Sequence, residues 1–249
     1  MPHEQVTITA PGGECRAFLF TLKGSGNGSR SSPGVLFFMD AGGIRPAMLT
    51  MAQRVADAGY AVLLPDLFYR YGDYGPLVPA EVLGPKMEAV LGPLIATTGN
   101  AVAAKDTSAF LDFLDGHPSV ADGLRGAVGF CVGGGMAIAA AGEHAGRIGA
   151  AASFHGGGLA TDAPDSPHRY AGDLSADLYV AAATDDPYYP PDMAARFRTA
   201  LSEASVPHEH ETYPAAHGWM VPDFPSHDEA AATRGWEALD AFFGRTLGL

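Results

Sequence analysis

One pentapeptide of the sequence combines a nucleophilic side chain with flanking glycines. Gly129-Phe130-Cys131-Val132-Gly133 lies where an apolar run, Arg125–Phe130, meets a run of small residues, Val132–Glu143. A nucleophile held in a strained turn between a strand and a helix needs glycines beside it, because a Cβ there would collide with backbone. The amino end of the helix offers free N–H groups, which stabilise a thiolate and an oxyanion. The pattern predicts a nucleophile elbow centred on Cys131.

Two other interpretations of this pentapeptide were weighed. Cys131 could be a buried cysteine before a glycine-rich helix, but glycines at both offsets arise by chance only about three times in a hundred for the two cysteines of this chain. The pattern is a weak match to a phosphate-binding loop, since the glycines are not followed by Lys and Ser or Thr. The catalytic interpretation is therefore favoured.

A nucleophile elbow is followed along the chain by an acid and then by a histidine. Asp185 and Asp186 follow the apolar run Leu178–Ala183, which places them just after a strand. His217 lies in a loop after the run His208–Tyr213. The order predicts His217 as the general base, with either aspartate as the acid that orients it.

The other eight histidines fit the base less well. His155 and His168 precede both aspartates, which is the wrong order. The alternation His208-Glu209-His210-Glu211 suggests a metal site, but two imidazoles without a third ligand are more typical of a polar strand face. We therefore expect no metal, and nucleophilic hydrolysis requires no organic cofactor.

The segments around these residues alternate between strands and helices. Continuous apolar runs are typical of strands buried on both faces of a parallel sheet. We expect an N-terminal hairpin of Val6–Ala10 and Cys15–Leu22, then strands at Val35–Met39, Tyr60–Leu64, Arg125–Phe130, Ile148–Phe154, Leu178–Ala183 and His208–Tyr213. We expect helices at Pro46–Gly59, Asn100–Asp115, Val132–Glu143, Met193–Ser205 and Asp228–Leu247. The sequence predicts an α/β fold, a mostly parallel sheet with helices on both faces, as one domain over residues 1–249.

Two segments depart from this alternation. Lys23–Pro33 is rich in Gly and Ser and is expected to be an exposed loop. Leu67–Gly99 mixes repeated Gly and Pro with Leu, Val and Met. A long broken excursion of this kind forms a lid or pocket wall, or packs as short helices on the core.

Composition limits the classes of protein and partner. The 249 residues include 15 Lys and Arg against 28 Asp and Glu, a formal net charge of −13, which argues against nucleic acid or anionic membrane as the main partner. No apolar run approaches the roughly 18 residues of a membrane span, and the first residues resemble no secretory signal. Two cysteines make no disulfide framework. We expect a soluble, cytoplasmic enzyme, either a monomer or a homodimer.

The whole chain resembles the dienelactone hydrolase family, a cysteine branch of the α/β-hydrolases. The resemblance runs from Val35 to Leu247 and is strongest in Gly129-Phe130-Cys131-Val132-Gly133-Gly134, Pro65-Asp66-Leu67-Phe68-Tyr69-Arg70, Asp186-Pro187 and His217-Gly218-Trp219. It implies an α/β-hydrolase fold in which Cys131 is the nucleophile, His217 the base, Asp186 (with Asp185 as runner-up) the acid, and the amides of Ala41 and Val132 the oxyanion hole.

Two positions depart from members of that family that open dienelactone. Those members have a glutamate at the position of Asp40 and an arginine at the position of Val221. In them, the pair controls the ionisation of the cysteine. The resemblance therefore implies that Asp40 tunes Cys131. Without an arginine at Val221, we expect the carboxylate to oppose thiolate formation more strongly. Alternatively, Asp40 only bonds amides of the Gly42-Gly43 turn.

These departures argue against dienelactone and for a more apolar ester or lactone. Arg70, Tyr188 and Trp219 are candidate substrate-binding residues, and Arg45 is a second possible anchor for an anion. The leading hypothesis is a hydrolase of small carboxylic esters or lactones. The alternative is a thiol-based redox or ligand-binding protein that has the same fold and no turnover.

Overall fold

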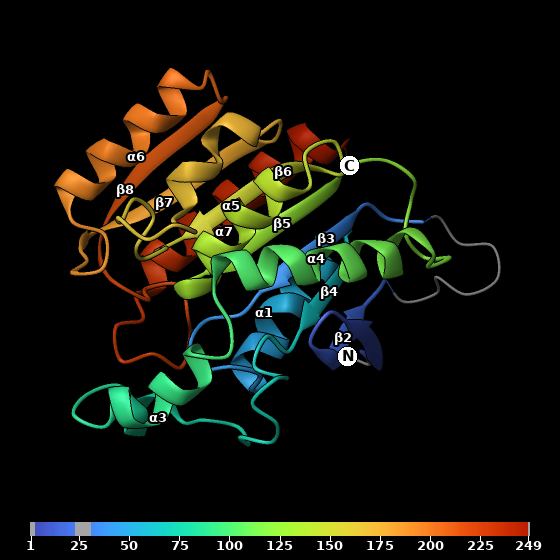
Figure 1. The fold of residues 1–249 in the computed structure, drawn as a ribbon, viewed down its shortest axis with the longest axis horizontal. Helices are drawn as coiled ribbons and strands as arrows, with labels where there is room; N and C mark the ends of the chain where they lie inside the picture. The colour runs from blue at the N-terminus through green and yellow to red at the C-terminus, as the bar shows by residue number, and fades with distance from the viewer. Residues whose placement is uncertain (1–2, 23–30, 249) are drawn as a thin grey trace.

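The computed structural model describes residues 3–22 and 31–248. In this part of the chain one sheet of eight strands has the order β1-β2-β4-β3-β5-β6-β7-β8 (Figure 1). The strands are β1 Glu4–Ala10, β2 Gly13–Phe20, β3 Gly34–Phe38, β4 Ala61–Pro65, β5 Arg125–Phe130, β6 Ile148–Phe154, β7 Asp177–Asp185 and β8 His208–Ala216. β1 pairs with β2, and β2 with β4, in the antiparallel direction. The remaining neighbours, from β4 through β3, β5, β6 and β7 to β8, are parallel.

Helices cover both faces of this sheet. They are α1 Pro46–Asp57, α2 Pro79–Val82, α3 Met87–Ile95, α4 Asn100–Asp115, α5 Val132–Glu143, α6 Pro191–Glu203 and α7 Glu229–Phe243, with a 3₁₀ turn at Pro167–Asp173 and a π turn at Gly244–Gly248. Gly129 of β5 faces α5, whereas Gly126, three positions earlier and so on the other face, abuts Phe243 of α7. Among the described residues, no helix is long and apolar enough to cross a membrane.

The predicted α/β fold is confirmed, and four elements have the predicted bounds. They are Asn100–Asp115, Arg125–Phe130, Val132–Glu143 and Ile148–Phe154. The helix expected from Met193 begins at Pro191, because proline suits a first helical position. The last helix ends at Phe243 rather than Leu247, and its cap, Asp228, accepts a hydrogen bond from Ala231 N at 2.9 Å.

The excursion, the segment Leu67–Gly99, contains α2 and α3, which stand off from the sheet in Figure 1. Leu91 and Leu94 of α3 are buried in the apolar core, whereas Val78 and Ile95 remain exposed. The excursion therefore packs partly as core and partly as an apolar surface. Most of the loop expected at Lys23–Pro33, residues 23–30, lies outside the described residues.

Candidate active site

The predicted elbow at Cys131 lies between the carboxyl end of β5 and the amino end of α5. Cys131 has φ 54° and ψ −121°, a strained conformation for a residue with a side chain. A Cβ on Gly129 would lie 1.9 Å from the Gly133 carbonyl oxygen, and one on Gly133 would lie 2.5 Å from the Met39 carbonyl oxygen. The two glycines therefore allow α5 to begin directly against β5 and the end of β3.

A continuous chain of contacts joins the three residues that the sequence singled out. His217 Nε2 lies 3.1 Å from Cys131 Sγ, and His217 Nδ1 lies 2.8 Å from Asp186 Oδ2. A carboxylate only accepts hydrogen bonds, so Nδ1 carries the proton and Nε2 faces the sulfur. Tyr188 N donates to the second Asp186 oxygen at 2.8 Å and fixes the carboxylate. The imidazole is therefore oriented for proton exchange with the thiol.

Asp185 and Asp186 differ in what they offer to His217. Asp185 is the last residue of β7, so it lies within the strand rather than just after it as expected, and its side chain is exposed. Its backbone carbonyl accepts the His217 N–H at 3.0 Å. The Asp186 side chain is fully buried against the imidazole. Only Asp186 has a carboxylate in contact with the ring.

The charge on His217 is governed by its two neighbours. Burial lowers the pKa of the imidazole, but the hydrogen bonds with Asp186 and Cys131 outweigh burial and raise it to about 10. A thiolate beside the ring favours the imidazolium in the same way. The contacts with Asp186 and Cys131 therefore favour the protonated form of the ring.

Two backbone amides near the sulfur remain free of intramolecular bonds. The next three amides after Ala41 are all used: Gly42 N donates to Asp40 Oδ1 at 2.7 Å, Gly43 N to the Asp40 carbonyl at 3.1 Å, and Ile44 N to the Tyr74 hydroxyl at 2.9 Å. Within residues 3–22 and 31–248, no hydrogen bond uses the amide of Ala41 or that of Val132, the first residue of α5. Both N–H groups can therefore donate to a bound group.

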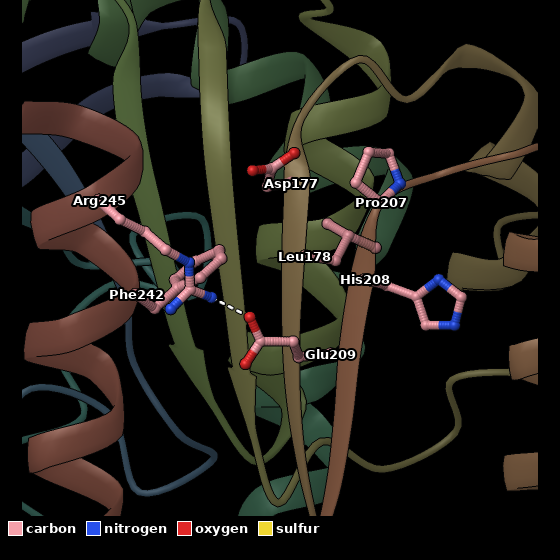
Figure 2. A pocket seen from close by; sticks show the side chains of 7 residues that line it. All are labelled: Asp177, Leu178, Pro207, His208, Glu209, Phe242 and Arg245. Atoms are coloured by element: carbon pink, nitrogen blue, oxygen red, sulfur yellow. Dashed lines mark hydrogen bonds and ion pairs between the residues drawn. The ribbon is translucent and has the colours of Figure 1, made fainter.

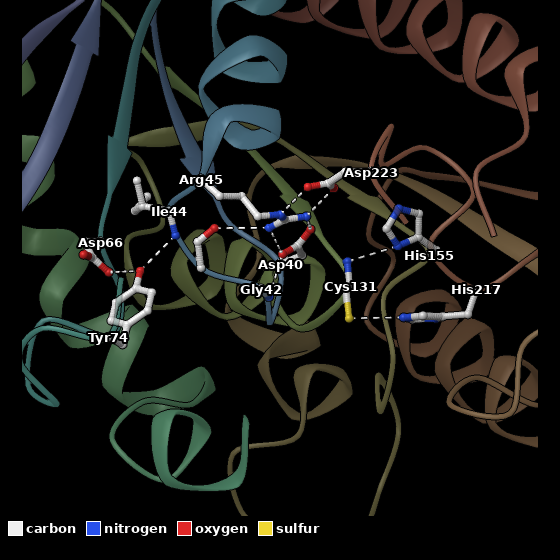
Figure 3. A network of polar contacts seen from close by, with 11 residues as sticks. Asp40, Gly42, Ile44, Arg45, Asp66, Tyr74, Cys131, His155, His217 and Asp223 are labelled. Carbon is white, nitrogen blue, oxygen red and sulfur yellow. Dashed lines mark hydrogen bonds and ion pairs between the residues drawn. The ribbon is translucent and has the colours of Figure 1, made fainter. Parts of the chain in front are cut away.

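Asp40 has a cationic partner, although no arginine stands at Val221. Arg45 Nη1 and Nη2 donate to the two Asp40 oxygens at 2.7 and 2.8 Å, and both side chains are buried (Figure 3). Burial raises the pKa of the Asp40 carboxyl, whereas Arg45 and the Gly42 amide oppose the rise. Both oxygens accept N–H bonds, which holds the group as a carboxylate. The cation comes from five residues downstream, and Val221 is buried and apolar.

The three predicted substrate-binding residues lie in different surroundings. Arg70 makes a two-bond ion pair with Asp106 of α4, at 2.6 and 2.8 Å. Trp219 is fully buried and stacks on Tyr213 at 4.4 Å between ring centroids. Tyr188 is 47% exposed, and its ring meets that of His217 edge-on at 4.9 Å between centroids. Of the three, only Tyr188 combines contact with the site and exposure to solvent.

His155 belongs to the site although the chain order excluded it as base. Its Nδ1 accepts the Cys131 N–H at 3.2 Å, and its ring lies 5.4 Å from that of His217 (Figure 3). Burial and the nearby His217 lower the pKa of His155 well below 6.5, so it is a neutral acceptor. Its place directly after β6 was the available signal, because parallel strands end at the same edge of the sheet.

Elsewhere in the described residues, neither a metal-ligand cluster nor a large pocket suggests a second site. In the described part of the chain, no group of three or more His, Cys, Asp or Glu residues could hold a metal ion. A hollow of about 130 Å³ lies where β7 and β8 begin, beside the ion pair of Glu209 with Arg245 (Figure 2). That is the opposite edge of the sheet from Cys131, and ligand pockets usually measure about 300 Å³ or more.

A mostly parallel sheet, with a histidine that contacts a cysteine and an aspartate at the carboxyl ends of the strands, is the arrangement of the α/β-hydrolase fold. The pattern that describes the dienelactone hydrolase family matches residues 16–247, so the chain belongs to the dienelactone hydrolase family, which consists of hydrolases.

Similar proteins match most of the chain in sequence, and solved structures match its fold. A Synechocystis sp. protein, provisionally named carboxymethylenebutenolidase, is 26% identical over 221 residues, which cover 86% of this chain and 87% of the relative. The structure of a Klebsiella pneumoniae protein, provisionally named dienelactone hydrolase, superimposes with a TM-score of 0.84 at 24% identity and 98% coverage of both chains. P91 from metagenomic libraries, named a dienelactone hydrolase-like promiscuous phosphotriesterase, gives a TM-score of 0.77 at 25% identity and the same coverage.

Proposed function

We propose that this protein hydrolyses small, uncharged carboxylic esters or lactones with Cys131 as the nucleophile. The observation that carries the proposal is the line of contacts from Cys131 Sγ through His217 to Asp186, at 3.1 and 2.8 Å. A sulfur next to an imidazole that a buried carboxylate orients is the arrangement that nucleophilic acyl transfer requires.

The reaction proceeds in two halves. Cys131 Sγ attacks the carbonyl carbon, and the amides of Ala41 and Val132 donate to the oxyanion that forms. When the C–O bond breaks, His217 Nε2 gives its proton to the leaving alkoxide and a thioester remains. Water then attacks the thioester, His217 takes its proton, and the acid leaves as Cys131 regains the thiolate. Asp186 stabilises the imidazolium in both halves.

The preference for an uncharged substrate follows from where the cations are bound. Arg45 is enclosed by Asp40 and Asp223, and Arg70 is bound to Asp106. Neither guanidinium is free to hold a substrate carboxylate. Tyr188, which meets the His217 ring and whose hydroxyl lies 3.9 Å from Met87 Sδ of α3, favours an apolar group instead.

The decisive experiment compares the two cysteines. Cys131→Ala should abolish turnover of p-nitrophenyl acetate and of small lactones, because no other group attacks the carbonyl. Cys15→Ala is the matched control: Cys15 is fully buried in β2, and burial raises the pKa of its thiol to about 12. This control should keep kcat/KM within a few-fold of wild type. The same panel should include a neutral phosphotriester, because the similar protein P91 is named a promiscuous phosphotriesterase.

The outcomes separate hydrolysis from the redox or ligand-binding alternative. A thiol sensor would be alkylated or oxidised at Cys131 but would release no acid catalytically from any ester in the panel. A wild-type protein without turnover, or a Cys131→Ala variant with wild-type turnover, would exclude the proposed chemistry.

A further inference from the structure

Arg45 connects two loops that lie far apart in the sequence. It follows the turn after β3, and Asp223, 178 residues later, lies in the loop after β8. Arg45 Nε and Nη2 donate to the two Asp223 oxygens at 2.8 and 2.9 Å, while its other edge holds Asp40 (Figure 3). Nη1 also donates to the Gly43 carbonyl at 3.2 Å. All five N–H donors of the guanidinium are therefore used.

Each loop carries one part of the proposed catalytic machinery. Asp40 immediately precedes Ala41, and its carboxylate shapes the turn that leaves the Ala41 amide free. On the other side, the loop with Asp223 begins at His217, whose carbonyl accepts a hydrogen bond from Ser226 Oγ at 2.6 Å. Arg45 thus touches neither the sulfur nor the imidazole, but it is bonded to both loops that place groups around the sulfur.

We propose that Arg45 is a positioning residue. By bonding both loops, it keeps the Ala41 amide and the His217 imidazole correctly placed relative to Cys131. The inference rests on the proposed function and adds a residue that acts through the loops rather than on the substrate. The Arg45 side chain is 1% exposed and that of Asp40 is 0% exposed, whereas that of Asp223 is 35% exposed. Arg45 and its two aspartates therefore form a clamp between the loops. Its inner half, Arg45 with Asp40, is buried beside the turn that follows Asp40, and its outer half, at Asp223, reaches solvent.

The guanidinium also compensates the charge of Asp40 close to the nucleophile. The first turn of α5 touches the residue before Asp40, because a Cβ on Gly133 would meet the Met39 carbonyl at 2.5 Å. Removal of Arg45 would leave a buried carboxylate without its cation in that neighbourhood, which disfavours a thiolate. A lysine would restore the charge with three donors instead of five and without the planar fork.

The test measures kcat and KM for p-nitrophenyl acetate in Arg45→Met, Arg45→Lys and a matched control, Arg125→Met. Arg125 is also a buried arginine, paired with Asp115 at 2.6 Å, but it begins β5 at the opposite end of the strand from Cys131. Displacement of catalytic groups by about 1 Å lowers rates by about 10²-fold, so Arg45→Met should lose roughly that in kcat with KM within a few-fold. Arg45→Lys should recover part of the loss, and Arg125→Met should lose thermal stability but keep kcat.

Asp223→Asn tests the outer half of the clamp in a side chain that tolerates change. It should lower kcat several-fold, and the double variant with Arg45→Met should be no worse than Arg45→Met alone, since Asp223 acts through Arg45. A second readout needs no substrate turnover: iodoacetamide should alkylate Cys131 more slowly at neutral pH in Arg45→Met than in wild type, with both proteins carrying Cys15→Ala.

The outcomes distinguish this inference from the proposed function. If wild type turns over and Arg45→Met matches Arg125→Met in kcat and wild type in alkylation rate, Arg45 is only structural and the inference is overturned. If wild type shows no turnover, the proposed function fails, and the alkylation rates alone decide the positioning role. If Arg45→Met does not fold, Arg45→Lys and Asp223→Asn decide it: unchanged kcat and alkylation in both would refute the clamp.

Discussion

At the scale of single residues, the Asp185-Asp186 pair provides a sharp comparison, because the two side chains are adjacent and only one meets His217. Asp186→Asn keeps the shape but loses the charge that stabilises the imidazolium. Loss of such a charge lowers kcat on the order of 10²–10⁴-fold in related triads. Asp185→Asn leaves intact the backbone carbonyl that accepts the His217 amide. We expect it to stay within about three-fold of wild type in kcat for p-nitrophenyl acetate.

The same comparison can refute the assignment. A larger loss in Asp185→Asn than in Asp186→Asn would move the acid by one position. Equal, small losses in both would show that His217 needs no carboxylate partner for turnover.

The raised pKa of His217 also has a consequence for stability. The imidazole has a pKa of about 10 in the folded protein against 6.5 as its ordinary value. The folded state therefore binds the proton more tightly, and the stabilisation is fully present below about pH 6.5 and lost as pH rises through about 10. The melting temperature of wild type should exceed that of His217→Gln most at pH 6 and fall towards it by pH 10.5. A difference in melting temperature that stays constant over that range would contradict the pKa shift.

Arg45 and His155 show which parts of the site could not be predicted from the sequence. Cys131, His217 and the Asp185-Asp186 pair could be singled out because an elbow pattern and the order of the strands limit where such residues lie, whereas the choice of Asp186 depended on the family resemblance. The partnership of Arg45 with Asp223 could not be predicted, since nothing local marks two side chains 178 positions apart that meet through two different loops. His155 was set aside as a base because it precedes both aspartates. That argument does not apply to a residue that bonds the backbone of Cys131.

At the scale of elements, the junction of β5, α5 and the end of β3 fixes the position of the sulfur. An alanine at Gly133 would push its Cβ into the Phe38 and Met39 carbonyls, both at 2.5 Å, and backbone cannot move aside cheaply. Overpacking of this kind costs about 1–3 kcal/mol. Gly133→Ala should therefore lower both the melting temperature and kcat.

The control for this junction is a glycine with open space around it. Gly172, in the 3₁₀ turn, has no heavy atom within 4 Å of the position that a Cβ would take. Gly172→Ala should leave kcat and the melting temperature close to wild type. If Gly133→Ala behaves in the same way, α5 does not need to approach β3 as closely as the structure has it.

Elements were predictable where local pattern and burial agree. Arg125–Phe130 and Val132–Glu143 have the predicted bounds because a continuous apolar run and a run of small residues change character at Cys131. The interior of the excursion was not predicted: α3 contains Pro93, and its Leu91 and Leu94 are held by the core rather than by helix propensity. Tertiary contacts decide such short helices, and they are invisible in one sequence.

At the scale of the whole molecule, the net charge of −13 acts on any charged substrate before it reaches the site. Repulsion of this kind slows the approach of an anion, and it reaches about 30 Å at 0.01 M ionic strength but only about 3 Å at 1 M. An uncharged ester is unaffected. The excursion beside the site adds little compensation, because its single cation between residues 71 and 99 is Lys86.

Salt should therefore separate charged from uncharged substrates. We expect kcat/KM for p-nitrophenyl acetate to stay constant between 0.01 M and 1 M NaCl, and that for a p-nitrophenyl ester with a free carboxylate to start lower and rise several-fold. It should remain below the neutral ester even at 1 M, because screening removes the repulsion but supplies no cation to bind the carboxylate. A carboxylated ester that is preferred at low salt, with the preference lost in Lys86→Met, would instead place a working anion anchor on the excursion and refute the preference for uncharged substrates.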